Sequence, residues 1–162
     1  MPGVIWSPEK FKSVKDTDWA RLAAFIDGEG CICIKAFKSK VGRRHQVVVQ
    51  VTNTDPSLPY WLVSTFQAGH IQQRNRIGKW STVYDWMVRG KQACYIIEKC
   101  MPFFVIKVDQ AKVALKFNAL GYYQKKNGQR LDPEIIGQRD VLQKELSVLK
   151  FRNKQKEAFH AG

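Results

Sequence analysis

Apolar residues recur with a helical period early in the chain and alternate with polar residues directly afterwards. Residues 17–27 form the first predicted helix, with Thr17 as its N-cap. Its apolar stripe consists of Trp19, Leu22, Phe25 and Ile26. Small residues that would let a second helix backbone come close follow another side, at Ala20, Ala23, Ala24 and Asp27. The pattern therefore predicts an amphipathic helix suited to a close helix contact.

Two β-hairpins are predicted after this helix. The period changes to two after Gly30, and residues 31–37 and 45–53 alternate on either side of a basic turn at 38–44. The remaining predicted elements are a short helix from Pro56 to near Gly69, a hairpin over 70–90 with its turn at 77–79, helices over 91–99 and 109–120 with a loop over 101–107 between them, and an amphipathic stretch around 141–149. We expect Trp61, Trp80 and Trp86 to pack in the core or on the sheet.

This order of elements predicts an α+β fold, αββαββα, with an antiparallel sheet. A chain of 162 residues with 44% hydrophobic content is sized for one domain. No internal repeat and no low-complexity segment divides it. We expect an N-terminal arm at 1–16, a core at 17–120 and a C-terminal helical extension of the same domain at 121–162.

The charge balance points to a polyanionic partner. Lys and Arg number 27 against 14 Asp and Glu, a formal net charge of +13, and such a field concentrates nucleic acid around a protein. No apolar run is long enough to span a bilayer, and the first residues carry no secretion signal. We therefore expect an intracellular protein, in an organelle or in a bacterial or archaeal cytoplasm, without a membrane partner.

The cysteines and histidines argue against a zinc site. Cys31, Cys33, Cys94 and Cys100 contain no C-x-x-C pair, and the three histidines are scattered singly. Cys31 and Cys33 are two apart in a predicted strand, a spacing that does not favour a disulfide between them. We expect all four cysteines to be reduced thiols, as in a reducing compartment.

The two hairpins combine basic side chains with glutamines. Between Glu29 and Asp85 the only acidic residue is Asp55. A solvated sheet face would explain one basic hairpin, but two of them favour DNA, because arginine pairs with guanine edges and glutamine with adenine edges in the major groove. The predicted DNA-binding residues are Cys33, Lys35, Phe37, Lys38, Lys40, Arg43, Arg44, Gln46, Gln50, Gln72, Arg74, Arg76 and Asp85.

The end of the first helix carries the most specific motif. Residues 22–30 read LAAFIDGEG, which resembles the LAGLIDADG motif of homing endonucleases. Five of its positions are identical, at Leu22, Ala23, Ile26, Asp27 and Gly30, while Glu29 stands for the final Asp and Ala24 for the Gly. The resemblance covers residues 17–120, and that family's fold has the same order of elements. It implies a DNA endonuclease, intron-encoded in many members.

The motif also suggests a metal-dependent site. Its glycines let the helix turn into a strand and present the Glu29 carboxylate, and with the Gly28 carbonyl this gives the oxygen ligands that Mg²⁺ prefers, with Mn²⁺ as a substitute. The resemblance implies that Lys107 stabilises charge at the scissile phosphate and that Asn53 positions water. Some of these residues also have an ordinary alternative. Lys107 and Glu29 could be solvated surface charges, and Cys33 could be a strand residue without a functional role.

A single motif implies a homodimer. Cutting both strands requires two carboxylates, so we expect a two-fold dimer built on Ala20, Ala23, Ala24 and Asp27, and a near-palindromic target cut to leave 3′ overhangs. One alternative is a related protein that binds DNA or intron RNA without cutting, such as a maturase or regulator. A basic RNA-binding structural protein would explain the charge but leaves LAAFIDGEG unexplained.

Overall fold

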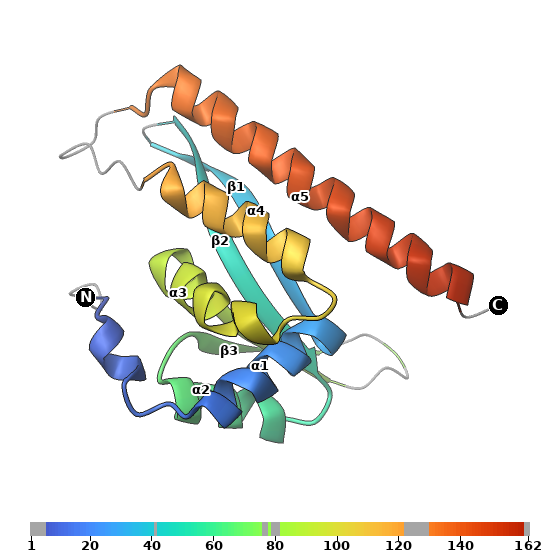
Figure 1. Ribbon diagram of the computed structural model, residues 1–162. Helices are drawn as coiled ribbons and strands as arrows, with labels where there is room; N and C mark the ends of the chain where they lie inside the picture. Colours follow the sequence, from blue (N-terminus) through green and yellow to red (C-terminus); the bar gives the residue numbers. More distant parts are fainter. Residues whose placement is uncertain (1–5, 41, 76–77, 79–81, 122–129, 161–162) are drawn as a thin grey trace.

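The computed structural model of the chain describes residues 6–40, 42–75, 78, 82–121 and 130–160 (Figure 1). The elements in chain order are η1 (Pro8–Phe11), α1 (Asp16–Glu29), β1 (Gly30–Ser39), β2 (Gly42–Asn53), α2 (Ser57–Phe66), β3 (His70–Arg74), β4 (Val83–Arg89), α3 (Gly90–Cys100), η2 (Met101–Phe103), α4 (Val108–Ala119) and α5 (Pro133–His160). From α1 to α3 this is the predicted order αββαββα. The predicted turn at 77–79 and Trp80 fall, apart from Gly78, outside the described residues.

The strands form one antiparallel sheet of four, in the order β1-β2-β4-β3. Helices α1, α3 and α4 pack against one side of it (Figure 1). Ile32, Val49 and Trp86 point to that side and are completely buried, because alternate strand residues face the helices. The predicted α+β class with an antiparallel sheet is confirmed.

Helix α1 buries its predicted apolar stripe. Trp19, Leu22 and Ile26 are buried in the core, and Phe25 packs on Trp61 with ring centroids 6.1 Å apart. The predicted N-cap is wrong, because the helix begins at Asp16 after Lys15 and no side chain caps it. Asp16 and Asp18 lie in the first turn, where carboxylates interact favourably with the positive end of the helix dipole.

The first hairpin turns more tightly than predicted. Ser39 pairs with Gly42, so Arg43 and Arg44 belong to β2 rather than to a turn over 38–44. Gly42 has a φ of +111°, a backbone conformation that glycine adopts without strain. None of the four cysteines is in a disulfide bond, which agrees with the expectation that they are reduced.

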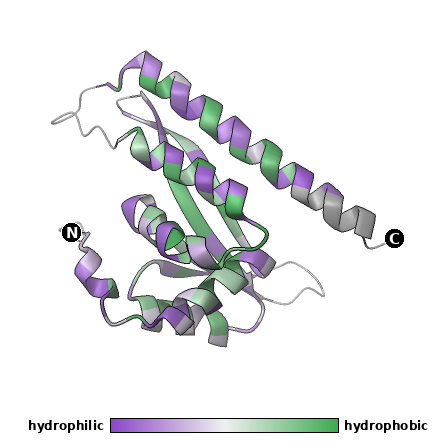
Figure 2. Ribbon diagram, viewed as in Figure 1, coloured by the Kyte–Doolittle hydropathy of each residue, from purple (hydrophilic) through white to green (hydrophobic). Residues whose placement is uncertain are grey.

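The C-terminal extension is one long helix, α5, which packs on α4 and along β1 (Figure 1). Figure 2 shows hydrophobic and hydrophilic residues interleaved along it, and Leu146 on its inner side is buried in the core. Asp140 ties the helix to β2 through His45 Nε2, 2.7 Å from its Oδ1. Within the described ranges, no helix is long and apolar enough to cross a membrane.

Candidate active site and nucleic-acid interface

The junction of α1 and β1 presents Glu29 to solvent. A Cβ atom on Gly30 would lie 2.5 Å from the Cα atom of Ile26 and 3.1 Å from the carbonyl oxygen of Gln50. Only glycine fits there, so the chain can leave the helix and enter the sheet without a gap between them. Gly28 faces open space, and the Glu29 side chain is exposed at the end of the helix.

Asn53 contacts Glu29 directly. Its Nδ2 atom donates to Glu29 Oε2 over 2.6 Å, although the two residues are 24 positions apart. Its Oδ1 atom accepts a hydrogen bond of 2.8 Å from the backbone N–H of Asp55, which fixes the orientation of the amide. The predicted pair Glu29 and Asn53 therefore forms one polar unit at the end of α1 and β2.

Asp27 holds the loop that carries Lys107. Its buried carboxylate accepts from the backbone N–H groups of Val105 at 2.7 Å and of Lys107 at 2.9 Å. The Lys107 ammonium in turn donates to the backbone carbonyl of Asp27. Lys107 thus lies at the same helix end as Glu29, which is the neighbourhood predicted for it.

The predicted dimer surface needs a correction on two residues. Ala23 has no exposed area and Asp27 only 8%, because both lie on the inward side of α1 with Trp19 and Ile26. Neither side chain is available to a second subunit. Ala24 and Gly28 are exposed and Ala20 is half-buried, so small residues at a spacing of four form the outward strip of the helix.

A thiol pair and a lysine of α5 adjoin the site. Lys150 Nζ lies 2.9 Å from Cys31 Sγ, two residues beyond Glu29. A hydrogen bond from Cys33 lowers the pKa of Cys31 to about 5, with the ammonium groups of Lys150 and Lys107 acting in the same direction against the effect of burial. The bond to Cys31, together with burial, raises the pKa of Cys33. No periodicity or motif pointed to Lys150, because its contact spans 119 positions.

Most of the predicted DNA-binding side chains share the side of the sheet away from the core, which we call the outer face. Residues paired directly across antiparallel strands point to the same side. By this register the outer face carries Cys33, Lys35, Phe37, Arg44, Gln46, Gln50, Gln72, Arg74 and Asp85. The predicted clustering of glutamines and arginines on one surface follows directly from the strand pairing.

Three predicted DNA contacts lie elsewhere. Lys38 and Arg43 pair with each other on the opposite side, where Arg43 forms an ion pair of 3.1 Å with Asp140 of α5. They lie on this side because one position along a strand reverses the side, and their contact with DNA from the hairpin tip stays a prediction. Lys40 is exposed at the hairpin turn. Arg76 falls outside the described residues.

Asp85 organises the outer face rather than presenting itself to a ligand. Only 1% of it is exposed, because its carboxylate accepts from Gln50 at 2.9 Å, from Thr52 and from two nitrogens of Arg74. Burial alone would raise its pKa, but the hydrogen bonds from Arg74, Thr52 and Gln50 hold the pKa below the usual value. Its predicted direct contact with DNA is therefore replaced by the positioning of Gln50 and Arg74.

The site offers oxygen ligands for a hard cation but not a complete cage. Glu29 supplies one exposed carboxylate and Gly28 an adjacent carbonyl. In the part of the chain that the structure describes, no three His, Cys, Asp or Glu side chains converge on one point. This donor set fits Mg²⁺, which usually takes one or two protein carboxylates and completes its shell with water and phosphate oxygens.

Comparison with known proteins supports the fold. No protein-family model and no curated protein sequence matches the chain. The solved structure of the homing endonuclease I-CvuI in complex with its DNA target gives a TM-score of 0.70 at 20% identity, covering 83% of this chain and 82% of that one. The archaeal intron-encoded homing endonuclease I-Vdi141I, complexed with DNA, gives 0.66 at 16% identity over 83% and 84%.

A third structure matches a longer chain. The LAGLIDADG homing endonuclease I-SmaMI bound to cleaved DNA gives a TM-score of 0.62 at 24% identity, covering 78% of this chain and 42% of that one. The matches include both chains of similar length to this one and a chain of which it covers less than half. Together with the LAAFIDGEG helix and the sheet built beside it, they show that this protein has the fold of the LAGLIDADG homing endonucleases.

Proposed function

We propose that this protein is a site-specific double-strand DNA endonuclease that acts as a homodimer with a divalent metal ion. Mg²⁺ is the first candidate for that metal. The observation that carries the proposal is the meeting of Glu29, Asn53 and Lys107 at the end of α1, next to a sheet face rich in arginine and glutamine. These three residues come from three separate elements. A shared position at the end of a LAGLIDADG-like helix favours a joint role in phosphodiester hydrolysis.

The outer face supports binding to duplex DNA. A two-stranded β-ribbon fits the major groove, where arginine and glutamine can read base edges. Arg74 and Gln50 are pre-positioned for this by Asp85, and Lys35 and Arg44 add cations for phosphates. The structurally similar I-CvuI and I-Vdi141I are both complexed with DNA.

The metal ion would be held by the Glu29 carboxylate and the Gly28 carbonyl, with phosphate oxygens and water completing its shell. When bound, it would neutralise charge on the scissile phosphate and on the leaving oxygen. Lys107 places a second cation near the same phosphate, and Asn53 fixes the direction of the Glu29 carboxylate. The I-CvuI complexes were obtained in the presence of Ca and of Mg.

The homodimer follows from the count of carboxylates. One chain offers one Glu29 site, whereas two strands have two scissile phosphates. The outward strip of Ala20, Ala24 and Gly28 on α1 lets two copies of the helix approach with their backbones close. A two-fold pair built on this strip would place the two Glu29 residues near each other and favour a near-palindromic target.

The test is cleavage of a randomised duplex library with Mg²⁺, followed by sequencing of the new ends. Glu29→Gln should abolish cleavage and leave DNA binding intact, because it removes a metal ligand without touching the outer face. Glu134→Gln, which neutralises an exposed carboxylate in the first turn of α5, is the matched control and should cut normally. A wild-type protein that binds duplex DNA but never cuts it would favour the non-cleaving alternative, and normal cleavage by Glu29→Gln would refute the proposed site.

A further inference from the structure

The C-terminal helix brings a lysine to the end of the sheet where Glu29 lies. Helix α5 packs along the edge strand β1, and its Leu146 is buried in the core. Lys150 follows Leu146 by four residues, so the two side chains lie on the same side of the helix. Lys150 is therefore directed toward the sheet, and it is half-buried there.

The Lys150 ammonium lies on the outer side of β1. Its Nζ atom is 2.9 Å from Cys31 Sγ. Cys31 pairs with Gln50, and residues paired directly across antiparallel strands point to the same side, which for Gln50 is the outer face. Glu29 precedes Cys31 by two residues across the extended backbone of Gly30, a separation of about 7 Å along the chain. The ammonium is thus next to the candidate catalytic carboxylate.

A second ammonium group acts on the same sulfur. Besides the hydrogen bond from Cys33, the ammonium groups of Lys150 and Lys107 lower the pKa of Cys31. Lys107 also donates to the backbone carbonyl of Asp27 at the end of α1. Two cations, one from α5 and one from the loop before α4, therefore lie near one sulfur. Even an ionised Cys31 leaves this group of side chains with a net positive charge.

The Lys150 ammonium has donors left for an anion. An ammonium group has three N–H donors, and a cysteine sulfur is only a weak acceptor. Among the residues that the structure describes, no Asp or Glu side chain forms an ion pair with Lys150. Burial of a charged group costs free energy unless a partner compensates for it. A phosphodiester group of bound DNA would supply that partner.

We propose that Lys150 contacts the scissile phosphate together with Lys107, so that the C-terminal helix contributes a catalytic residue to the site. Cys31 holds the ammonium in place, and the remaining N–H groups donate to the phosphate oxygens on which negative charge builds up during hydrolysis. The inference rests on the proposed endonuclease function. It adds a residue from outside residues 17–120, the part of the chain that resembles the family.

The experiment compares two properties of Lys150→Met in the full-length protein, on a duplex that the wild type cuts. The first is affinity at several salt concentrations in EDTA, where each phosphate contact contributes about 0.9 to the slope of log K against log salt. The second is the single-turnover rate of cleavage with Mg²⁺ at saturating protein. We expect the slope to fall by about 0.9 and the rate by about 10²-fold. Lys150→Arg keeps the charge and should restore most of both.

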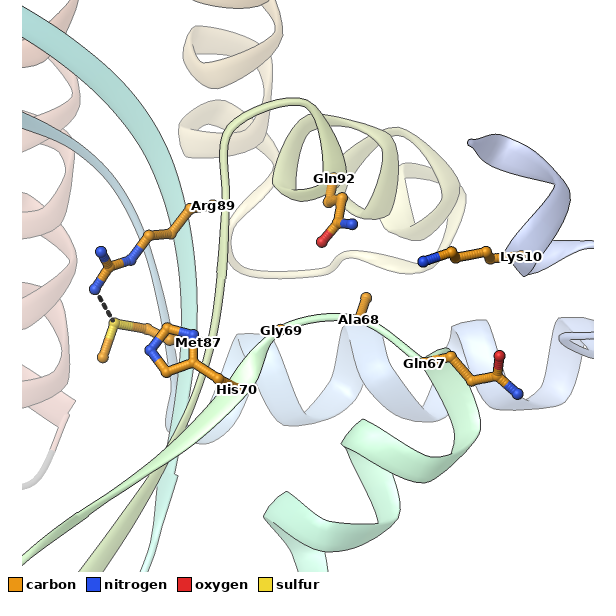
Figure 3. A pocket seen from close by; sticks show the side chains of 8 residues that line it. All are labelled: Lys10, Gln67, Ala68, Gly69, His70, Met87, Arg89 and Gln92. Carbon is orange, nitrogen blue, oxygen red and sulfur yellow. Dashed lines mark hydrogen bonds between the residues drawn. The ribbon is translucent and has the colours of Figure 1, made fainter. Parts of the chain in front are cut away.

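Two lysines provide matched controls. Lys144 is exposed on the same helix. Lys10 is half-buried like Lys150, but Figure 3 shows its ammonium on the other side of the β3 and β4 backbone from the Arg89 side chain, which belongs to the outer face by strand register. Lys144→Met and Lys10→Met should therefore keep the wild-type slope and the wild-type rate.

The combination of the two measurements decides the role of Lys150. An unchanged slope and rate in Lys150→Met would show that Lys150 does not contact DNA. A lower slope with a wild-type rate would place it on a phosphate away from the cut, and a lower rate with a wild-type slope would mean that it acts through the fold. Each of these three results overturns the proposal.

Two further checks separate this proposal from loss of structure and from failure of the proposed function. Methionine keeps the apolar stem of lysine, so Lys150→Met should fold, which urea denaturation measures, and Lys150→Gln is a second variant with the same expected losses. A wild-type protein that never cuts DNA would reject the proposed function and the role of Lys150 with it. Normal cleavage by Lys150→Met would reject the role of Lys150 alone.

Discussion

Asp85 lies in the middle of the outer face, yet its carboxylate is covered by the donors of Gln50, Thr52 and Arg74. A buried carboxylate that accepts from three residues fixes the orientation of each of their side chains, because leaving any donor unpaired would cost free energy. The 48% exposure of the Arg74 side chain shows that its guanidinium still faces outward while it is held. At the residue scale, an acid inside a basic surface therefore positions the side chains that we propose to read DNA.

We expect Asp85→Ala to relax sequence preference at the base positions read by Gln50 and Arg74. Loss of the shared acceptor frees both side chains and should lower the free energy of unfolding by about 1 to 3 kcal/mol. The salt slope of DNA binding should not decrease, since no phosphate contact is lost. Selection from a randomised library measures the preference and urea denaturation the stability. Unchanged preference in a folded variant would show that Gln50 and Arg74 do not depend on Asp85.

Cys31 gives a prediction for pH. Because the pKa of Cys31 in the folded protein is about 5, below its ordinary value of 9.0, ionised Cys31 stabilises the folded state. Because the pKa is lowered in the folded protein, the contribution of Cys31 to the free energy of unfolding is complete above pH 9, shrinks as the pH falls and is lost at pH 5. Alkylation by iodoacetamide should reach half its maximal rate near pH 5 at Cys31. Cys33→Ala should move that midpoint upward, because it removes the hydrogen bond that lowers the pKa most. A midpoint near pH 9 in the wild type would contradict this account.

At the element scale, the junction of α1 and β1 decides where the candidate catalytic carboxylate points. The helix can end and the strand begin within one residue because Gly30 has no side chain between Ile26 and Gln50. Asn53 at the end of β2 and the loop before α4 then meet the end of α1 through hydrogen bonds to Glu29 and Asp27. Three elements thus depend on the geometry of one junction.

Two glycines of this junction should respond in opposite ways to the same substitution. Gly30→Ala places a methyl group 2.5 Å from a backbone atom and should cost about 1 to 3 kcal/mol or more of unfolding free energy, with loss of cleavage. Gly28→Ala meets nothing within 4 Å and lies inside α1, so it should stabilise the monomer fold by up to about 1 kcal/mol. Thermal and urea unfolding measure both. Equal stability of the two variants would contradict the close packing at Gly30.

At the scale of the whole molecule, a single chain presents one carboxylate at one edge of a basic sheet. The outward strip of α1 lies at the same end as that carboxylate, so pairing two copies through it would join the two sites and the two outer faces. Helix α5 packs on α4 and on the edge strand β1, and its Lys150 contacts Cys31. The C-terminal extension therefore borders the site that contains Glu29.

Ala24→Leu should convert the proposed dimer to monomers. The larger side chain enters the helix contact twice, once from each subunit, while the monomer fold is kept because Ala24 is exposed. Sedimentation should show a dimer for the wild type and a monomer for the variant, and double-strand cleavage should be lost. Ala119→Leu, also an exposed alanine near a helix end, is the control and should stay dimeric and active. A wild-type monomer that cuts both strands, or an active Ala24→Leu dimer, would refute the symmetric arrangement.

The sequence alone determined the order of the elements, the LAAFIDGEG helix end and the basic character of both hairpins. These features are local: a period of 3.6 or 2 defines a helix or a strand, and a net charge is a sum. Asn53 and Lys107 were placed near Glu29 by resemblance to a known family, and their positions agree with that expectation. Their roles remain predictions.

The tertiary structure alone decided which side of each element is covered and which distant residues meet. Periodicity identified the small residues of α1, but only packing showed that Ala23 and Asp27 face inward and that Ala24 faces outward. Strand register alone decided that Arg43 lies on the side of Asp140 and that Asp85 lies on the outer face beside Arg74. Lys150 contacts Cys31 across 119 positions of the chain. Such contacts depend on the folded path of the whole chain, because no short stretch of sequence contains both partners.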